Sequence, residues 1–292
     1  HALGLAYVRA AGNLQSGREG AVAKRMQPAF AAQSGLVSAE LAGRGVTGPR
    51  QVFEGQYNFF RLYDSDYYDE SEVRRRLDGS LYDHGALLNG LGESFEVAKL
   101  IVKPYGSCRF THGPLEATLN IVRAHNLKPE EIQCIRVLAC PRAVRDYGKP
   151  FYPNASRTPE VSAQFSIPYV VAAAVIHRSG YIDAFEKRAV LDPRVKDLVD
   201  KVTVEVHPEA ALKVPVQVEV ETVRGHRYIE RIDALKASLD RPLSYPEILA
   251  KFRENARYAA RSVGEDRLNE LIDLTLNIER VGNVREIVAL IS

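Results

Sequence analysis

The chain has 292 residues, of which 46% are hydrophobic and 26% charged, and its formal net charge is +2. This composition is typical of a soluble globular protein with one large domain or two ordinary ones, and the small charge does not suggest nucleic acid or an anionic membrane as a partner. Since no apolar run approaches the ~20 residues that a membrane span requires, the sequence favours a cytoplasmic enzyme or binding protein.

Residues 1–95 are predicted to be helical. The chain begins inside an apolar helical pattern that includes Leu3, with no capping residue before it, which indicates a polypeptide that starts partway through a domain. Small residues dominate a predicted helix at 24–43, and such helices approach each other closely, so a dense helical bundle is expected. The aromatic residues of segment 55–69 are expected to pack in a core or an interface.

Residues 96–238 have a different pattern, in which short alternating segments are mixed with helical ones. Alternation predicts strands and spacing of three or four predicts helices. The region therefore predicts an α+β domain with a small, mostly antiparallel sheet. The expected strands are 95–102, 131–140, 202–207, 214–223 and 228–232, and the expected helices are 114–125, 162–177 and 193–200.

Residues 239–292 return to helical patterns, with Ser244 and Pro246 as a start signal for the first of them. We predict helices at 245–257, 264–277 and 284–291. The fold class is therefore a large all-α helical domain, made of residues 1–95 and 239–292, with the α+β domain inserted between its two segments.

The segment 103–112 reads Lys-Pro-Tyr-Gly-Ser-Cys-Arg-Phe-Thr-His and is the densest cluster of reactive side chains in the chain. It is predicted to connect a strand to a helix whose first turn suits Pro114. Backbone amides at the helix start, together with Lys103 and Arg109, can bind an anion there. The alternative is an ordinary loop with solvated Arg and His side chains.

Four further side chains of this loop, besides the two cations, are candidates for chemistry or binding. His112 can act as an acid or a base near neutral pH. Cys108 lies beside Arg109 and is either a partly ionised thiol or a small buried residue. Ser107 and Thr111 add hydroxyl groups that can bind a substrate.

Three more candidates lie outside the loop. Lys24 and Arg25 open the predicted helix 24–43, where the helix dipole prefers anions, so either a bound anion compensates them or they are a solvated pair. Tyr147 lies in a loop bounded by Gly and Pro and is either a proton donor or a cap on a hydrophobic edge.

Several chemistries lack their usual signals in this sequence. The three cysteines form no C-x-x-C pair, and Cys134 and Cys140 are predicted to be small buried residues on one face of a strand. The seven His residues have no ligand spacing, so no metal site is predicted. Neither G-x-G-x-x-G nor a Walker pattern occurs, and no cofactor is predicted.

Six motifs follow one another along the chain: His-Ala-Leu-Gly-Leu-Ala (1–6), Ala-Lys-Arg with Ala-Ala-Gln-Ser-Gly (23–35), Gly-Val-Thr-Gly-Pro-Arg (45–50), Lys-Pro-Tyr…Cys-Arg-Phe-Thr-His (103–112), Ala-Gln-Phe-Ser-Ile-Pro-Tyr (163–169) and Asp-Pro-Arg-Val (192–195). In these motifs the chain resembles the MmgE/PrpD family, which includes 2-methylcitrate dehydratase, cis-aconitate decarboxylase and iminodisuccinate epimerase. The resemblance implies a large all-α domain with an inserted α+β lid domain, a metal-free site between them, and usually a homodimer. It also implies small di- and tricarboxylate substrates and carbanion-like intermediates that cations stabilise.

The resemblance also implies roles for individual residues. Lys24 matches the active-site lysine of the family, Tyr147 its active-site tyrosine, and His112 a second His of the lid loop. Cys108 stands where decarboxylase-type members have a catalytic His, which argues against cis-aconitate decarboxylation. An N-terminal segment that supplies an Asp and further His residues in the family has no counterpart in this sequence.

The first functional hypothesis is a hydro-lyase of the 2-methylcitrate dehydratase type. In it Lys24, Arg25 and Arg109 hold substrate carboxylates, while His112 and Tyr147 move protons. The alternatives are a dicarboxylate epimerase or isomerase, a decarboxylase of the same family, and a truncated, inactive homologue that binds carboxylates or serves as a dimerising scaffold.

Overall fold

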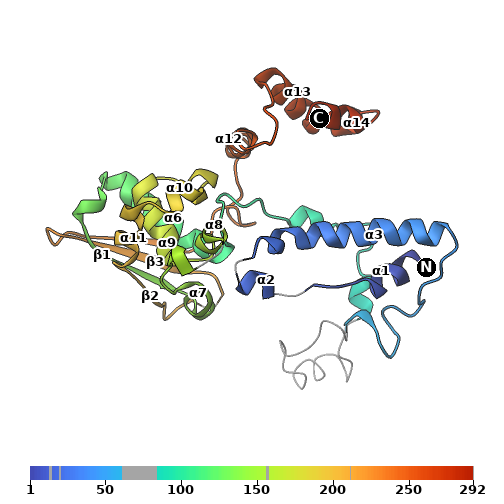
Figure 1. Cartoon of the computed structure of the whole chain (residues 1–292), viewed down its shortest axis with the longest axis horizontal. Coiled ribbons are helices and arrows are strands. Elements are labelled where there is room, and N and C mark those ends of the chain that lie inside the picture. The colour runs from blue at the N-terminus through green and yellow to red at the C-terminus, as the bar shows by residue number, and fades with distance from the viewer. Residues whose placement is uncertain (13–14, 20, 61–83, 156–157, 211, 292) are drawn as a thin grey trace. The chain divides into compact units, whose positions relative to one another are not determined.

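The computed structural model describes residues 1–292 except 13–14, 20, 61–83, 156–157, 211 and 292 (Figure 1). Its contacts divide the chain into two compact units. The first consists of His1–Leu100 with Ser156–Ser162, and the second of Ile101–Ala155 with Ala163–Ser292. Among the described residues, no helix is long and apolar enough to cross a membrane.

The first unit is helical, as its sequence predicts. Helix α1 packs along helix α3, and the backbone at 48–49 lies so close to Gly4 that a Cβ there would be 2.1 Å from the carbonyl oxygen of Pro49. The described elements of this unit are α1 (Ala2–Val8), α2 (Gln15–Arg18), α3 (Gln27–Gly43) and 3₁₀ turns at Val22–Met26, His84–Leu87 and Glu96–Lys99.

Helix α3 is more exposed than the expected dense bundle requires. Ser38 is its one buried residue, while Phe30 and Leu36 are largely exposed. Its small side chains bury little apolar area, so they provide little driving force for packing on their own. Of the aromatic segment, Phe59 and Phe60 contact each other edge to face with ring centroids 5.9 Å apart, and residues 61–69 lie outside the described part.

The predicted strand at 95–102 is wrong. A 3₁₀ turn occupies Glu96–Lys99, and the apolar side chains that alternate around it, such as Phe95 and Val97, are exposed. An alternating segment forms a strand only where a partner strand takes its backbone hydrogen bonds and a core covers one face. Neither condition is met at this position.

The second unit is built on a four-stranded mixed sheet with the order β2-β1-β3-β4. Strand β1 pairs in parallel with β2 and antiparallel with β3, and β3 and β4 form an antiparallel hairpin. Gly225 lies in the hairpin turn with φ +80°, which a residue without a Cβ adopts at little cost. The strands are β1 (Ile132–Ala139), β2 (Val202–Val206), β3 (Val216–Thr222) and β4 (Arg227–Ile232).

Helices α6 (His112–His125), α9 (Ile167–His177) and α11 (Pro193–Val199) lie against this sheet (Figure 1). Helix α6 packs on β3, β4 and α9, and α9 packs on β2 and α11. Helix α9 consists mainly of Val, Ala and Ile residues and is buried along nearly its whole length, so it forms the centre of the core.

The predicted helix at 162–177 is two helices. Helix α8 ends at Ala163, and α9 begins at Ile167 after Ser166, whose hydroxyl accepts a hydrogen bond from the amide of Tyr169 at 3.2 Å. Pro168 follows in the first turn, where its missing N–H costs nothing, so the local signals favour a new start.

Of the remaining described helices, those at 245–256, 265–276 and 285–289 match predicted ones, whereas those at 141–147 and 187–190 form where no helix is predicted. Helix α12 begins at Tyr245 after a capping box of Ser244 and Glu247, as the start signal predicts. The assignment of 239–292 to the same domain as 1–95 stays a prediction. The other elements are α7 (Pro141–Tyr147), α8 (Pro159–Ala163), α10 (Lys187–Val190), α12 (Tyr245–Ala256), α13 (Glu265–Leu276), α14 (Arg285–Ala289) and 3₁₀ turns at Arg109–Thr111, Pro129–Glu131, Pro153–Ala155, Ile182–Phe185 and Ile278–Arg280.

The two cysteines of the β1 segment do not share a buried face. Cys140 is buried, but Cys134 is exposed, because the register of β1 against β3 shifts between Ile132 and Cys134. A bulge places both Ile132 and Ile135 in the core and leaves the residues between them outside. The prediction of a buried Cys134 is therefore wrong.

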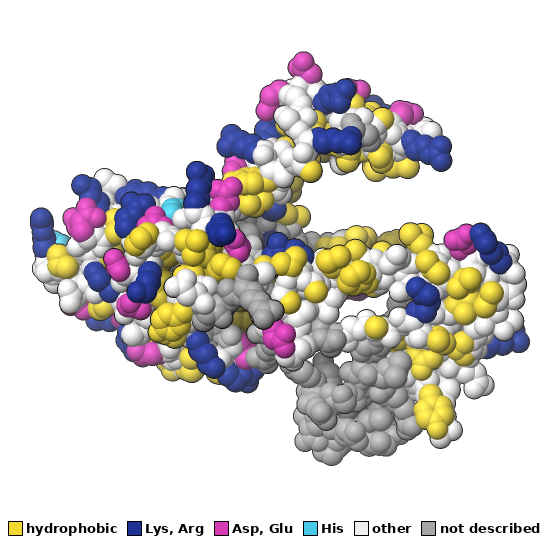
Figure 2. Space-filling view, viewed as in Figure 1, with side chains coloured by type: hydrophobic (Ala, Val, Ile, Leu, Met, Phe, Trp, Pro, Cys, Tyr) yellow, Lys and Arg dark blue, Asp and Glu magenta, His cyan; other side chains and the backbone are white. Residues whose placement is uncertain are grey.

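The face of the second unit that Figure 2 shows has a mixed charge. Lys and Arg side chains are interspersed there with Asp and Glu side chains, in keeping with the formal net charge of +2. This face has no extended field of one sign that would attract a polyanion.

Candidate active site in the loop before helix α6

The loop that leads into α6 is fixed to the second unit through its backbone. The amide of Gly106 donates to the carbonyl of Gly180 at 2.9 Å, and the amide of Cys108 donates to the carbonyl of Gln164 at 2.9 Å. The loop is thus fixed to the two segments that flank α9, and its shape is set before any ligand binds.

Ser107 and Thr111 are buried and bind each other. The Thr111 hydroxyl lies 2.8 Å from the Ser107 hydroxyl and 2.8 Å from the Cys108 carbonyl. These hydroxyl groups are thus occupied in closing the turn that starts α6. Their predicted contact with substrate stays a prediction, and the geometry favours a structural role.

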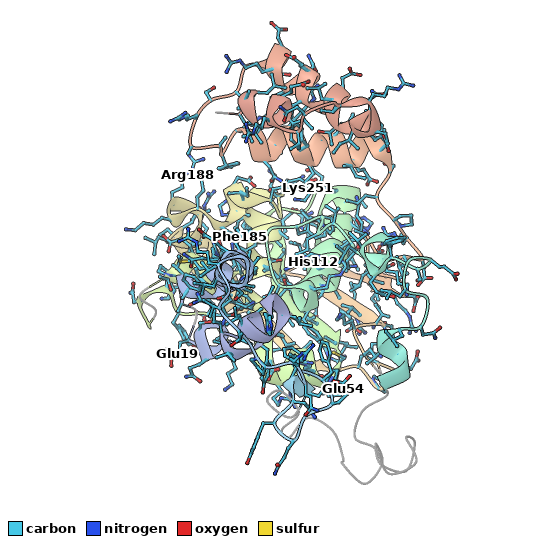
Figure 3. All side chains as sticks on the ribbon, turned by 90° about the vertical axis from the view of Figure 1, so that its right-hand side faces the viewer. Glu19, Glu54, His112, Phe185, Arg188 and Lys251 are labelled. Carbon is cyan, nitrogen blue, oxygen red and sulfur yellow. The ribbon has the colours of Figure 1, made fainter. Side chains whose placement is uncertain are left out.

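His112 is only 1% exposed, and Figure 3 labels it within the second unit. Its Nε2 lies 3.2 Å from the Ser107 carbonyl oxygen, and its Nδ1 lies 3.2 Å from Nη1 of Arg109. Since a carbonyl only accepts and a guanidinium only donates, the imidazole is the neutral tautomer with its proton on Nε2. Both ring nitrogens are therefore engaged.

Burial and the neighbouring charge of Arg109 lower the pKa of His112 to about 3. The ring also packs edge to face on Tyr105, with centroids 5.3 Å apart. His112 is therefore neutral at physiological pH. Its geometry suits the orientation of Arg109 better than the transfer of a proton.

Arg109 is held by neutral acceptors. Its Nη1 donates to the Lys236 carbonyl oxygen at 2.7 Å in addition to its contact with His112. Burial lowers the pKa of the guanidinium, while the carboxylate of Glu116 acts in the opposite direction. An arginine in this setting stays a cation.

Sequence reasoning missed an ion pair beneath this loop. Glu116 lies one turn after His112 on α6, and its Oε1 accepts from Nη2 of Arg241 at 2.5 Å. Its second oxygen, Oε2, is buried and has no hydrogen-bond partner among the described residues. A Glu among the apolar, core-facing positions of α6 is a signal in the sequence, but its partner lies 125 positions away.

Lys103 reaches back over the loop. Its Nζ lies 3.3 Å from the Ser107 carbonyl oxygen, the same oxygen that His112 approaches. The side chain is exposed, so the ammonium lies at the surface beside the buried His112.

Cys108 and Tyr147 form a second group of this site. Tyr147 is the last residue of α7, so the prediction that it lies in a loop is wrong. Burial raises the pKa of its hydroxyl to about 12, and Cys108 adds to this rise through charge and a side-chain hydrogen bond. The structure thus brings together a thiol and a phenol that the sequence places in different segments. The Tyr147 ring also stacks on Phe110, with centroids 5.4 Å apart.

Lys24 and Arg25 belong to the first unit. They lie in the 3₁₀ turn Val22–Met26 that leads into α3, where Lys24 is half-buried and Arg25 is exposed, and both have interaction partners. The helix begins at Gln27, so the two cations precede it and do not open it as predicted. Their part in a common site with the loop stays a prediction.

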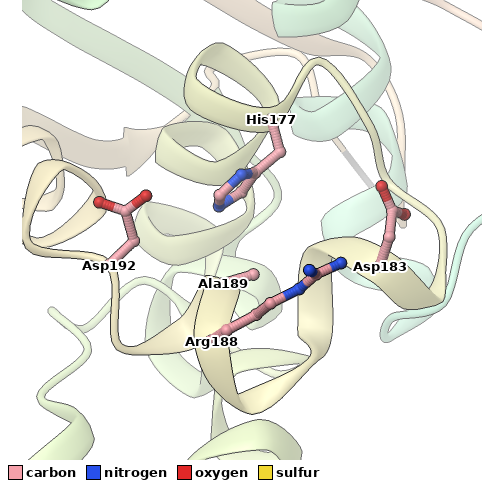
Figure 4. Close-up of a pocket in the computed structure, with 5 residues that line it drawn as sticks. All are labelled: His177, Asp183, Arg188, Ala189 and Asp192. Carbon is pink, nitrogen blue, oxygen red and sulfur yellow. The ribbon is translucent and has the colours of Figure 1, made fainter.

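A separate cavity of about 290 Å³ lies at the far end of α9. His177 points into it between Arg188 and Asp192 (Figure 4), and the Nε2 of His177 has no hydrogen-bond partner among the described residues. None of the predicted site residues lines it. The residues that line it are His177, Asp183, Arg188, Ala189 and Asp192.

Within the described residues, no group of three or more His, Cys, Asp or Glu side chains could hold a metal ion. The candidate site consists of cations, hydroxyl groups and a thiol. These groups suit the binding of a carboxylate and the movement of a proton.

Comparison with known proteins gives the family. Residues 1–70 match the MmgE/PrpD N-terminal domain, and residues 105–277 match the MmgE/PrpD C-terminal domain. A cis-aconitate decarboxylase-like protein of Aspergillus oryzae is 27% identical over all of this chain and 59% of its own length. A cis-aconitate decarboxylase of Aspergillus terreus is 25% identical over the same shares.

The human cis-aconitate decarboxylase is 23% identical over 85% of this chain and 48% of its own length. The chain thus spans less than two thirds of the length of these relatives. The C-terminal-domain match alone covers more than half of the chain and includes the whole sheet and residues 105–112 of the loop before α6. The predicted resemblance is confirmed, and the chain belongs to the MmgE/PrpD family.

Proposed function

We propose that this chain acts as a lyase on a small tricarboxylate, and that decarboxylation of cis-aconitate is the first reaction to test. Family membership and relatives named as cis-aconitate decarboxylases support a lyase of this kind. The observation that carries the proposal is one loop that joins a preoriented cation, Arg109, to the Cys108–Tyr147 pair.

Arg109 is the proposed carboxylate ligand of the loop. Its Nη1 is held by a carbonyl and a neutral imidazole, neither of which cancels its charge. The remaining N–H groups of a guanidinium form a fork that matches a carboxylate. Lys103 beside it, and Lys24 and Arg25 of the first unit, are proposed as further cations for the other carboxylates.

Tyr147 is the proposed proton donor. Decarboxylation breaks a carbon–carbon bond, releases CO₂ and leaves an electron pair as an allylic carbanion, which must take up one proton. A phenol whose pKa is raised to about 12 keeps its proton at neutral pH and can give it to such a carbanion. The Cys108 thiol can return a proton to Tyr147 and then recover its own from water, which balances the cycle.

The role proposed for His112 changes from proton carrier to positioning residue. Its pKa of about 3 leaves no imidazolium at neutral pH, and both nitrogens already have partners. It holds Arg109 in the orientation in which the guanidinium meets a carboxylate.

Dehydration of 2-methylcitrate is the second candidate reaction. It is favoured by one residue, since Cys108 stands where decarboxylase-type members use a His. The same cations would hold the substrate carboxylates, and water would leave in place of CO₂. Epimerisation of a dicarboxylate and simple carboxylate binding are the remaining alternatives.

The test is incubation of the protein with ¹³C-labelled cis-aconitate and, separately, with 2-methylcitrate. NMR in D₂O follows CO₂ release, loss of water, and deuterium that enters without net reaction, which marks epimerisation. We expect Tyr147→Phe to lower kcat by about 10²–10⁴-fold while binding is retained. The exposed Tyr152 provides the matched control, Tyr152→Phe. Absence of turnover with both acids would refute the proposal.

A further inference from the structure

Two cations outside the candidate site lie close to the ring of Phe110. The Cζ of Arg142 lies 5.3 Å from the ring centre, and the Nζ of Lys213 lies 5.5 Å from it. Tyr147, the proposed proton donor, stacks on the same ring. No pattern in the sequence predicts this arrangement, because the cations come from the start of α7 and from the segment before β3.

The positive charge at this ring is not balanced within the described residues. Asp146 is the carboxylate nearest to Arg142, with 3.7 Å between Oδ2 and Nε, but it also pairs with Arg145 at 3.0 Å. Lys213 forms no ion pair in the part of the chain that the structure describes. An aromatic ring attracts a cation only weakly at an exposed position, so the ring orients both groups without neutralising them.

We propose that Arg142 and Lys213 form a second carboxylate subsite beside Tyr147, which makes the site selective for tricarboxylates over dicarboxylates. This inference rests on the proposed function. Arg109 takes one carboxylate of the substrate, and a carboxylate bound at Arg142 and Lys213 lies next to the hydroxyl that supplies the proton. The planar guanidinium of Arg142 can orient a carboxylate, and the ammonium of Lys213 adds a second positive charge that attracts it.

The experiment measures binding of unreactive polycarboxylates by isothermal titration calorimetry. The probes are propane-1,2,3-tricarboxylate and succinate, and the variant is Arg142→Gln with Lys213→Gln. We expect the wild type to prefer the tricarboxylate, and the variant to lose at least about tenfold in affinity for it but less than threefold for succinate. The matched control changes two exposed cations of the same unit, Lys196→Gln with Arg224→Gln, and is expected to bind like the wild type.

A second variant separates charge from shape. Phe110→Leu removes the ring but keeps both cations, so we expect it to lose part of the preference for the tricarboxylate. Thermal melting followed by circular dichroism checks that each variant is folded. An unchanged ratio of the two affinities in the double variant would overturn the subsite.

Failure of the subsite and failure of the proposed function give different results. A wild type that binds the tricarboxylate preferentially, and loses that preference in the double variant, but turns over neither acid, supports the subsite and refutes the lyase. Turnover of one of the acids by the wild type, together with an unchanged preference for the tricarboxylate in the double variant, supports the lyase and refutes the subsite. A wild type that binds neither probe overturns both.

Discussion

Acidification is expected to destabilise this protein through one buried side chain, His112. In the folded chain its pKa is about 3, whereas an exposed His in the unfolded chain titrates near 6.5. Between these two values the unfolded chain binds a proton that the folded chain does not. The free energy of unfolding therefore falls as the pH decreases from 6.5 towards 3.

The size of the effect follows from the two pKa values. Between pH 7.5 and pH 5.0 the linkage relation gives a loss of about 2 kcal/mol from this one residue, rising to about 4–5 kcal/mol near pH 3. His112 is almost fully buried, so solvent screening takes little from this value. A loss of 2 kcal/mol is a large part of the stability of an ordinary domain.

The assay is urea unfolding, followed by circular dichroism, at several pH values between 7.5 and 5.0. The wild type is compared with His112→Gln, which keeps a donor for the Ser107 carbonyl but does not titrate. The matched control is His226→Gln, which removes an exposed His from the β3–β4 turn. Equal losses of stability in the wild type and His112→Gln would refute a buried, neutral His112.

Three further predictions concern stability and rate. Arg241→Met is expected to lower the free energy of unfolding by about 1–3 kcal/mol, because it leaves buried Glu116 without its cation. Urea titration should show that the double variant with Glu116→Gln recovers part of this loss. Gly113→Ala is expected to lower the free energy of unfolding by about 1–3 kcal/mol, because the new Cβ would lie 2.8 Å from a side chain of β3. The control is Gly35→Ala, which adds a methyl group in open space on α3 and should not lower the melting temperature. With Tyr147 as the proton donor, kcat/KM is expected to show no loss from Tyr147 ionisation below pH ~10, because the pKa of this hydroxyl is about 12. A loss below that pH in the wild type that disappears in Tyr147→Phe would contradict the assignment.

Strong periodic patterns allowed much of the second unit to be predicted. The helices at 114–125 and 193–200 and the four strands that form the sheet lie within a few residues of their expected positions. Their apolar residues match the period of the element, and a core covers the face that the pattern identifies. The false strand at 95–102 has the alternation without the core, and alternation alone cannot distinguish the two cases.

The candidate site was predictable in its residue types and not in their environments. The loop 103–112 is identifiable from its composition, but the low pKa of His112 depends on burial and on Arg109, and neither can be read from the residue type. Cys134 illustrates the same limit for the sheet, because one bulge reverses the face on which a side chain lies. The Glu116–Arg241 and Cys108–Tyr147 pairs join distant segments, and a single sequence carries no signal for such contacts.

The order of strands in the sheet has a consequence for how the chain reaches its folded state. Strand β1 lies in the interior of the sheet, and both of its neighbours come much later in the sequence, with Ile135 opposite Val202 in β2 and Val220 in β3. Only the β3–β4 hairpin can form from local contacts, so β1 must wait for the segments that follow it. During synthesis an apolar strand with two unpaired edges therefore precedes its partners, and aggregation competes with folding at that stage.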